Sequence, residues 1–152
     1  MRLLELDRPV AADRRGGFAR RRLEADIDAA GAIDWVQRPV TALNDSRAPL
    51  YEWFTDARVN TCWNAVDRHV LAGRGKQAAI IHDSPVTGTK HVITYAELLD
   101  RVSRLAGALK ARGVGKGDRV IIYMSMSVEG VAAMQACARI GATHSVVYGG
   151  FS

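Results

Sequence analysis

The sequence predicts an α/β fold in which a parallel sheet begins, preceded by a helical and irregular amino-terminal segment. Three observations support this class. Two apolar runs, RVIIYM at 119–124 and SVVY at 145–148, are separated by a helical pattern, which is the order of a βαβ unit. Both runs are almost continuously apolar, as strands of parallel sheets are. A long amphipathic helix precedes them. Because only two strands of this sheet are visible, we expect an incomplete fold.

Charge is unevenly distributed along the chain. The 152 residues carry a net charge of +5, and 48% of them are hydrophobic, which suits a globular core. Residues 1–22 hold seven basic and three acidic side chains, whereas the remainder holds 14 and 13. This segment lacks the apolar stretch of a secretory signal. We expect a basic, disordered tail. Nucleic-acid binding through its arginines is an alternative that the near-neutral remainder disfavours.

From residue 18 to 54 the pattern changes from helical to irregular. FARRRLEADIDAAG at 18–31 predicts a short amphipathic helix that Gly31 ends. The segment from 34 to 54 is irregular and contains four aromatic residues: Trp35, Tyr51, Trp53 and Phe54. Aromatic rings in a long loop usually anchor it by burial. We therefore expect this segment to pack on a larger body.

A helix and a hairpin are predicted next. Asn60 is a candidate N-cap for a helix that ends at Gly73 and places four residues on one face: Cys62, Val66, His69 and Val70. Strands at 78–82 and 91–94 flank DSPVTGTK, a segment of turn-forming residues.

The two cysteines do not predict a metal or disulfide site. Cys62 and Cys137 lie 75 positions apart, and neither they nor the four histidines form a metal-binding motif. We expect buried free thiols in a reducing cytoplasm and no metal ligands. No stretch is apolar for long enough to predict a membrane span.

The clearest helix follows Thr94, which forms a T-x-x-E capping box with Glu97. Apolar residues then recur at 3.6-residue spacing up to Gly113. GVGKGD at 113–118 does not satisfy the GxxxxGK[ST] pattern of a phosphate loop. We interpret it as a helix-to-strand connection.

The predicted βαβ unit occupies the last third of the chain. Ser127 is a candidate N-cap for a helix that runs to Ile140, with Val131, Met134 and Ala138 inward, and Gly141 closes it. We expect the strand at 119–124 to be buried on both faces. Ligands of such sheets bind beyond the carboxyl ends of the strands, where Gly149 and Gly150 lie. These glycines either approach a ligand or let the chain turn.

Five segments together resemble the beginning of the acetyl- and propionyl-CoA synthetases, which are adenylate-forming enzymes. They are NTCWNAVDRH, DSPVTGTK, TYAELL, GVGKGDRV and ACARIGATHSVVYGGFS. The resemblance runs from about Asp34 to Ser152, and DSPVTGTK is more similar to the propionyl-CoA branch.

This resemblance implies an organisation and a reaction. Residues 23–73 would be the amino-terminal wrapping segment of the synthetase, and 74–152 the first, truncated part of its AMP-binding domain. In the family, an acid and ATP form an acyl-adenylate, and CoA then displaces AMP. YGGFS matches the family's FGGFS, so that Tyr148, Gly149 and Gly150 would contact CoA. The phosphate loop and catalytic lysine would lie after Ser152, so we expect no catalysis, no catalytic residue and no tight binding of CoA or of ATP with magnesium by this chain alone.

The sequence departs from the family at YMSMSVEG, where family members usually read YMPM-x-PEA. Ser125 and Val128 replace prolines, Gly130 replaces alanine, and Tyr148 stands for phenylalanine. A second reading is a non-catalytic module that docks onto a partner or onto the remainder of the synthetase, since the unfinished sheet leaves an unpaired edge. Self-association through that edge is a further expectation.

Overall fold

The computed structural model describes residues 30–147, which are divided into two compact units between Val59 and Asn60. The predicted tail at 1–22 and most of the predicted helix at 18–31 lie outside the described residues. The last two residues of that helix, Ala30 and Gly31, are helical.

The first unit consists of two small antiparallel strand pairs rather than the irregular segment predicted from the sequence. β1 (Trp35–Gln37) pairs with β4 (Arg58–Val59), and β2 (Leu43–Asn44) pairs with β3 (Glu52–Trp53). Strands of two or three residues carry too little alternation to be recognised in a sequence.

Aromatic rings hold these strand pairs together. The Trp35 ring lies 5.7 Å from that of Phe54, and Phe54 lies 6.1 Å from Trp53. The Trp35 indole N–H donates to the Ala30 carbonyl at 2.9 Å. Tyr51 and Trp53 are more than 40% exposed. Within this unit Phe54 therefore packs between Trp35 and Trp53.

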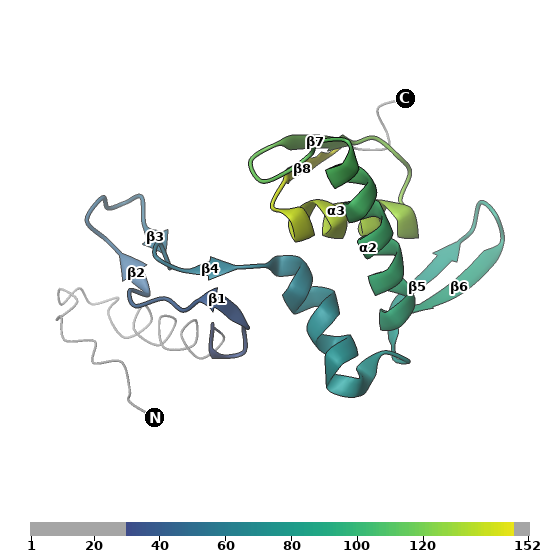
Figure 1. Ribbon diagram of the computed structural model, residues 1–152, viewed down its shortest axis with the longest axis horizontal. Coiled ribbons are helices and arrows are strands. Elements are labelled where there is room, and N and C mark those ends of the chain that lie inside the picture. Colours follow the sequence, from purple (N-terminus) through teal and green to yellow (C-terminus); the bar gives the residue numbers. More distant parts are fainter. Residues whose placement is uncertain (1–29, 148–152) are drawn as a thin grey trace. The chain divides into compact units, whose positions relative to one another are not determined.

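The second unit contains the predicted helix, hairpin and βαβ unit in that order (Figure 1). Its elements are two π-helical segments η1 (Trp63–Asp67) and η2 (Val70–Arg74), the hairpin β5 (Ala78–Ser84) and β6 (Thr89–Thr94), α2 (Tyr95–Ala111), β7 (Arg119–Ile122), α3 (Val128–Ile140) and β8 (Thr143–Val146). β7 and β8 are parallel, with Arg119 opposite Thr143 and Ile122 opposite Val146. No helix of the described residues is both long enough and apolar enough to cross a membrane.

The helix boundaries follow the capping signals in the sequence. Asn60 Oδ1 accepts the Trp63 N–H at 3.0 Å, as its predicted cap role requires. Thr94 and Glu97 form the predicted capping box, in which Glu97 Oε2 accepts the Thr94 N–H at 2.7 Å. Ser127 Oγ accepts the Gly130 N–H at 3.2 Å, and Gly141 ends α3 in a left-handed conformation with φ of 77°. These caps satisfy backbone groups that a helix end leaves unpaired.

The core of the second unit lies where α2 packs against α3 and against the η1 segment. Its fully buried side chains include Cys62, Val66 and Val102. Five residues of α3 are buried, whereas the predicted inward residues Val131, Met134 and Ala138 are half-buried; the buried ones are Val128, Ala132, Ala133, Ala136 and Cys137. The prediction is confirmed for Ala138, which packs against the core cluster. It is wrong for Val131 and Met134, because small residues of α3 make the closest contacts with the neighbouring elements.

The β7–β8 pair is covered on one side only. Ile122 is 3% exposed, but Ile121 is 72% exposed and Val146 is 44% exposed. The expectation that the strand would be buried on both faces is therefore wrong for the described residues. Parallel strands need cover on both faces, and residues 30–147 provide one layer, α3.

An ion pair between Asp67 and Arg139 joins η1 to the end of α3. Both oxygens of Asp67 are used: Oδ1 lies 2.7 Å from one terminal nitrogen of Arg139 and Oδ2 lies 2.9 Å from the other. The Asp67 side chain is only 13% exposed. Asn60 Nδ2 donates to the Arg139 carbonyl at 3.2 Å. Two-pronged pairing of this kind fixes both position and orientation.

Cys62 lies against the same pair. Its Sγ is 3.7 Å from Asp67 Oδ2 and 3.7 Å from a terminal nitrogen of Arg139. Burial raises the pKa of the Cys62 thiol, and the hydrogen bond from Arg139 opposes that shift without cancelling it. Cys62 and Cys137 are both buried and free, as predicted.

We predict that Asp67→Ala lowers the free energy of unfolding by about 2–4 kcal/mol, because Arg139 loses its partner in a partly buried position. Thermal or urea unfolding measures the change. The control is Asp100→Ala, which breaks an exposed pair with Arg104 and should cost under about 0.5 kcal/mol. Equal effects of the two substitutions would contradict a structural role of the buried pair.

Stability should also fall above about pH 8.5, the ordinary pKa of a free thiol. The unfolded chain releases the Cys62 proton there, whereas the folded chain retains it, so the free energy of unfolding declines by up to about 1.4 kcal/mol per pH unit. Unfolding at pH 7 to 9.5 tests this. Cys62→Ser lacks the titrating thiol and should lose stability with pH less steeply; parallel curves for both proteins would refute the assignment to Cys62.

Candidate functional site

The carboxyl edge of the β7–β8 pair is where a ligand is expected in a sheet of this type. β7 ends at Ile122, and the Val147 N–H donates to the Ile122 carbonyl at 3.0 Å, which extends the pairing by one residue. Val147 is also the last described residue. The predicted CoA contacts Tyr148, Gly149 and Gly150 follow it directly and lie outside the described residues. The described part of the chain therefore ends at this edge of the strand pair.

The loop between β7 and α3 borders the same edge and exposes large apolar side chains. Tyr123, Met124 and Met126 are all exposed. A methyl group added to Gly130 would lie 3.6 Å from Met124 Sδ, an ordinary contact distance. The alanine that the family usually has would therefore fit here, and close packing does not require glycine.

The amino terminus of α3 is occupied by its own side chains. Ser127 accepts the Gly130 N–H, and Glu129 forms an ion pair with Arg101 at 3.1 Å. A hydrogen bond from its own backbone N–H, helped by Ser127, Arg101 and His82, lowers the pKa of Glu129. A carboxylate at this helix end opposes the binding of a second anion. These residues are therefore not a phosphate cradle.

Most backbone amides of the connection GVGKGD are engaged in hydrogen bonds within the fold, in agreement with its interpretation from the sequence as a helix-to-strand connection. The Gly115 N–H donates to Asp118 Oδ2 at 2.8 Å. The Gly117 N–H donates to the Gly141 carbonyl at 3.2 Å. Gly113 and Gly117 have φ of 85° and 92°, which glycine adopts without strain. Their role is to return the chain from α2 to β7.

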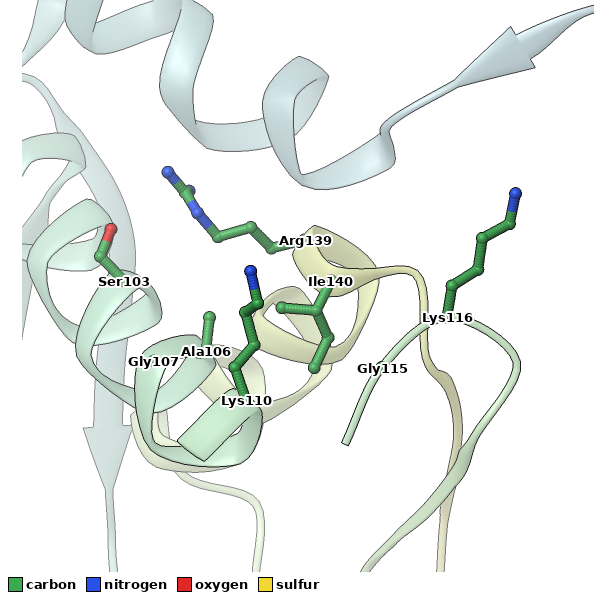
Figure 2. Close-up of a pocket in the computed structure, with 8 residues that line it drawn as sticks. All are labelled: Ser103, Ala106, Gly107, Lys110, Gly115, Lys116, Arg139 and Ile140. Atoms are coloured by element: carbon green, nitrogen blue, oxygen red, sulfur yellow. The ribbon is translucent and has the colours of Figure 1, made fainter. Parts of the chain in front are cut away.

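The structure brings together a group of cationic residues that sequence reasoning did not identify. Lys110, Lys116 and Arg139 line one hollow at the opposite, amino-terminal edge of the strand pair (Figure 2). Lys110 belongs to α2, Lys116 to the connection and Arg139 to α3. The only signal in the sequence was the basic content of residues 110–119, and nothing in it placed Arg139 nearby.

Two family models match the chain, and the residues that they match correspond approximately to the two compact units. Residues 67–152 match the family described as "AMP-binding enzyme", and residues 28–65 match "Acetyl-coenzyme A synthetase N-terminus". The chain is 57% identical over 120 residues to acetyl-coenzyme A synthetases of Burkholderia lata, Burkholderia thailandensis and Burkholderia mallei. These matches cover 79% of this chain and 18% of each relative. The matched part of the chain thus spans less than a fifth of the length of each of these relatives.

Proposed function

The chain belongs to the AMP-binding enzymes, and we propose that it forms the opening, CoA-facing part of an AMP-forming short-chain acyl-CoA synthetase. One observation carries the proposal. The parallel β7–β8 pair ends at Val147, so the sheet edge at which such folds bind ligands leads straight into YGGFS.

The proposed reaction has two steps. A carboxylate such as acetate or propionate attacks the α-phosphate of ATP, which gives an acyl-adenylate and releases diphosphate. The CoA thiol then attacks the acyl carbonyl and AMP leaves. Adenylation converts a poor leaving group into a good one, and binding aligns the thiol with the carbonyl.

We assign CoA contact to three residues of this chain. The Tyr148 ring offers a face for stacking, and Gly149 and Gly150 permit close approach of the backbone. Residues 30–147 contain no cluster of three acidic, histidine or cysteine side chains suited to a metal.

Catalysis requires parts that residues 30–147 do not supply. Departure of diphosphate needs phosphate ligands and cations near the developing charge. The Gly130 amide at the start of α3 and the Gly115 and Gly117 amides of the connection are engaged in hydrogen bonds within the fold. We therefore propose that the phosphate loop and the catalytic lysine come from the remaining length of a synthetase.

The organisation that we propose for the chain keeps the boundaries predicted from its charge distribution and from the resemblance. Residues 1–22 are a basic tail, 23–73 the wrapping segment, and 74–152 the first part of the AMP-binding domain. We place the protein in the cytoplasm, where the unpaired thiols of Cys62 and Cys137 stay reduced.

The test pairs this chain with a polypeptide carrying the remaining length of an acetyl-CoA synthetase. ATP–diphosphate exchange reports adenylation, and thioester formation reports the second step. Neither activity is expected from the chain alone. In the pair, Gly150→Val should raise the CoA concentration required for half-maximal rate by about tenfold or more and change exchange by under about twofold.

Val86→Ala is the control for this experiment, because Val86 is 94% exposed on the hairpin turn. It should change neither half-reaction. Equal damage to exchange and thioester formation by Gly150→Val would reject the CoA assignment. Exchange by the chain alone would reject the need for a second part.

A second candidate function is a docking module without catalysis of its own. The observation in its favour is the uncovered β7–β8 pair, where Ile121 is 72% exposed and each strand has one unpaired edge among residues 30–147. Unpaired strands of this kind recruit other chains. In isolation, a second copy of the chain is the available partner.

Self-association should therefore depend on Ile121. Sedimentation of the isolated chain is expected to reveal dimers or larger species. Ile121→Lys should shift the distribution toward the monomer, because burying an isoleucine side chain in an interface contributes about 1.5–3 kcal/mol and the lysine replaces that apolar surface by a charge. Val86→Lys introduces the same charge at an exposed turn and should leave the distribution unchanged. A monomeric parent chain would count against this surface.

A further inference from the structure

The side chain of Arg74 joins the end of η2 to the start of α2. Its Nη1 lies 3.1 Å from His69 Nδ1, and its Nε donates to Gln77 Oε1 at 2.7 Å. Its guanidinium carbon also lies 5.8 Å from the centre of the Tyr95 ring, within the range of a cation–π contact. One side chain therefore contacts the residue that precedes η2, the turn that follows it and the first residue of α2.

His69 and the backbone of the turn complete this junction. The His69 and Tyr95 rings pack together, with their centroids 4.8 Å apart and their planes inclined at 48°. The Tyr95 N–H donates to the Gln77 carbonyl at 3.0 Å, and the Ala96 N–H donates to the Gly75 carbonyl at 3.0 Å. The cluster of His69, Arg74 and Tyr95 therefore lies where η2, the turn and α2 meet.

The contact between Arg74 and His69 requires a neutral imidazole. A guanidinium has N–H donors and no acceptor, so His69 Nδ1 accepts the hydrogen bond. A neutral imidazole whose Nδ1 accepts carries its proton on Nε2. Protonation of His69 would put an N–H donor on Nδ1 as well, and two positively charged donors would then face each other. The hydrogen bond is therefore lost when His69 is protonated.

The charged groups that act on His69 are both cationic. Arg74 approaches it from the end of η2, and Arg68 approaches it from the end of η1, where Arg68 also donates to Asn64 Oδ1 at 3.3 Å. α2 contributes the Tyr95 ring. Partial burial lowers the pKa of His69, and the charges of Arg74 and Arg68 lower it further. No carboxylate among residues 30–147 offsets these effects.

The backbone beside Arg74 can change conformation once this contact is lost. Gly73 has φ of 79°, in the left-handed region that glycine enters and leaves without strain. A methyl group added to Gly73 would have no neighbour within 4 Å. Packing therefore does not restrain this position, and the adjacent Arg74 restrains the segment through its contacts with His69, Gln77 and Tyr95.

We propose that His69 and Arg74 form an acid-sensitive switch that holds the end of η2 against the start of α2. At neutral pH, Arg74 donates to His69 and the junction is closed. When His69 gains a proton, its Nδ1 can no longer accept, so the Arg74 guanidinium moves away and the turn at 75–77 becomes mobile. This switch does not depend on the proposed synthetase activity.

The folded chain should therefore lose stability below about pH 6.5, the ordinary pKa of histidine. Because the pKa of His69 is lowered in the folded chain, the unfolded chain takes up this proton at a higher pH than the folded chain does. The stabilisation is complete above about pH 6.5 and is lost as the pH falls through the lowered pKa. Over that interval the equilibrium constant for unfolding rises by up to about tenfold per pH unit, since one proton is involved.

An NMR titration of the 152-residue chain between about pH 5 and 8 tests the switch. The His69 ring should titrate below about pH 6.5, and the amide signals of Gly75 and Gln77 should shift with the same midpoint. Arg74→Ala removes the donor and one positive charge, so the midpoint should rise. Lys76→Ala removes the same charge from an exposed side chain that does not shift the pKa of His69, and the midpoint should stay unchanged.

Urea unfolding at several pH values gives an independent test. His69→Asn keeps an acceptor near the position of Nδ1 but does not titrate, so its free energy of unfolding should fall less than that of the parent between about pH 7 and 5. His91→Asn, at an exposed position of the hairpin, should follow the parent. The proposal fails if His69 titrates at or above about pH 6.5, if Arg74→Ala and Lys76→Ala move its midpoint equally, or if His69→Asn and the parent lose stability in parallel.

Discussion

The ion pair between Asp67 and Arg139 joins segments that lie 72 positions apart, and the packing of the second unit depends on it. Asn60, at the start of the same helical segment, holds the Arg139 carbonyl. Asn60 and Asp67 thus hold both the main-chain carbonyl and the side chain of Arg139. Because Arg139 is in the last turn of α3, this contact holds the end of α3, which Gly141 closes, against η1. A charged pair with 13% exposure of its carboxylate is costly to form and more costly to break.

The second constraint on the packing is the small size of the side chains between α2 and α3. Ala106 on α2 and Ala132 and Ala136 on α3 belong to one core cluster, and residues of this size let two helices approach closely. α3 then covers Ile122 but leaves Ile121 in solvent. The β7–β8 pair has two faces, and residues 30–147 supply a helix, α3, for one of them. The other face is therefore uncovered in this part of the chain.

The two edges of the β7–β8 pair differ in electrostatic character. At the carboxyl edge, Ser127 and Glu129 already use the amides of α3, so charge there is balanced by local residues and by Arg101. At the amino-terminal edge, Lys110 and Lys116 remain without acidic partners among the described residues. One βαβ unit therefore presents an apolar, locally neutral edge and a cationic edge.

The sequence by itself determined the helix ends, the hairpin and the parallel pair, because capping residues, turn residues and apolar periods act over a few positions. It also determined the family, through five short segments in a fixed order. Asn60, Thr94, Ser127 and Gly141 all have the roles that their chemistry predicts. Only the tertiary structure decided the four short strands of the first unit, the buried face of α3, the exposure of Ile121 and the meeting of Lys110, Lys116 and Arg139. Each of these depends on which distant segments pack together, and no local pattern encodes a contact such as that between Asp67 and Arg139.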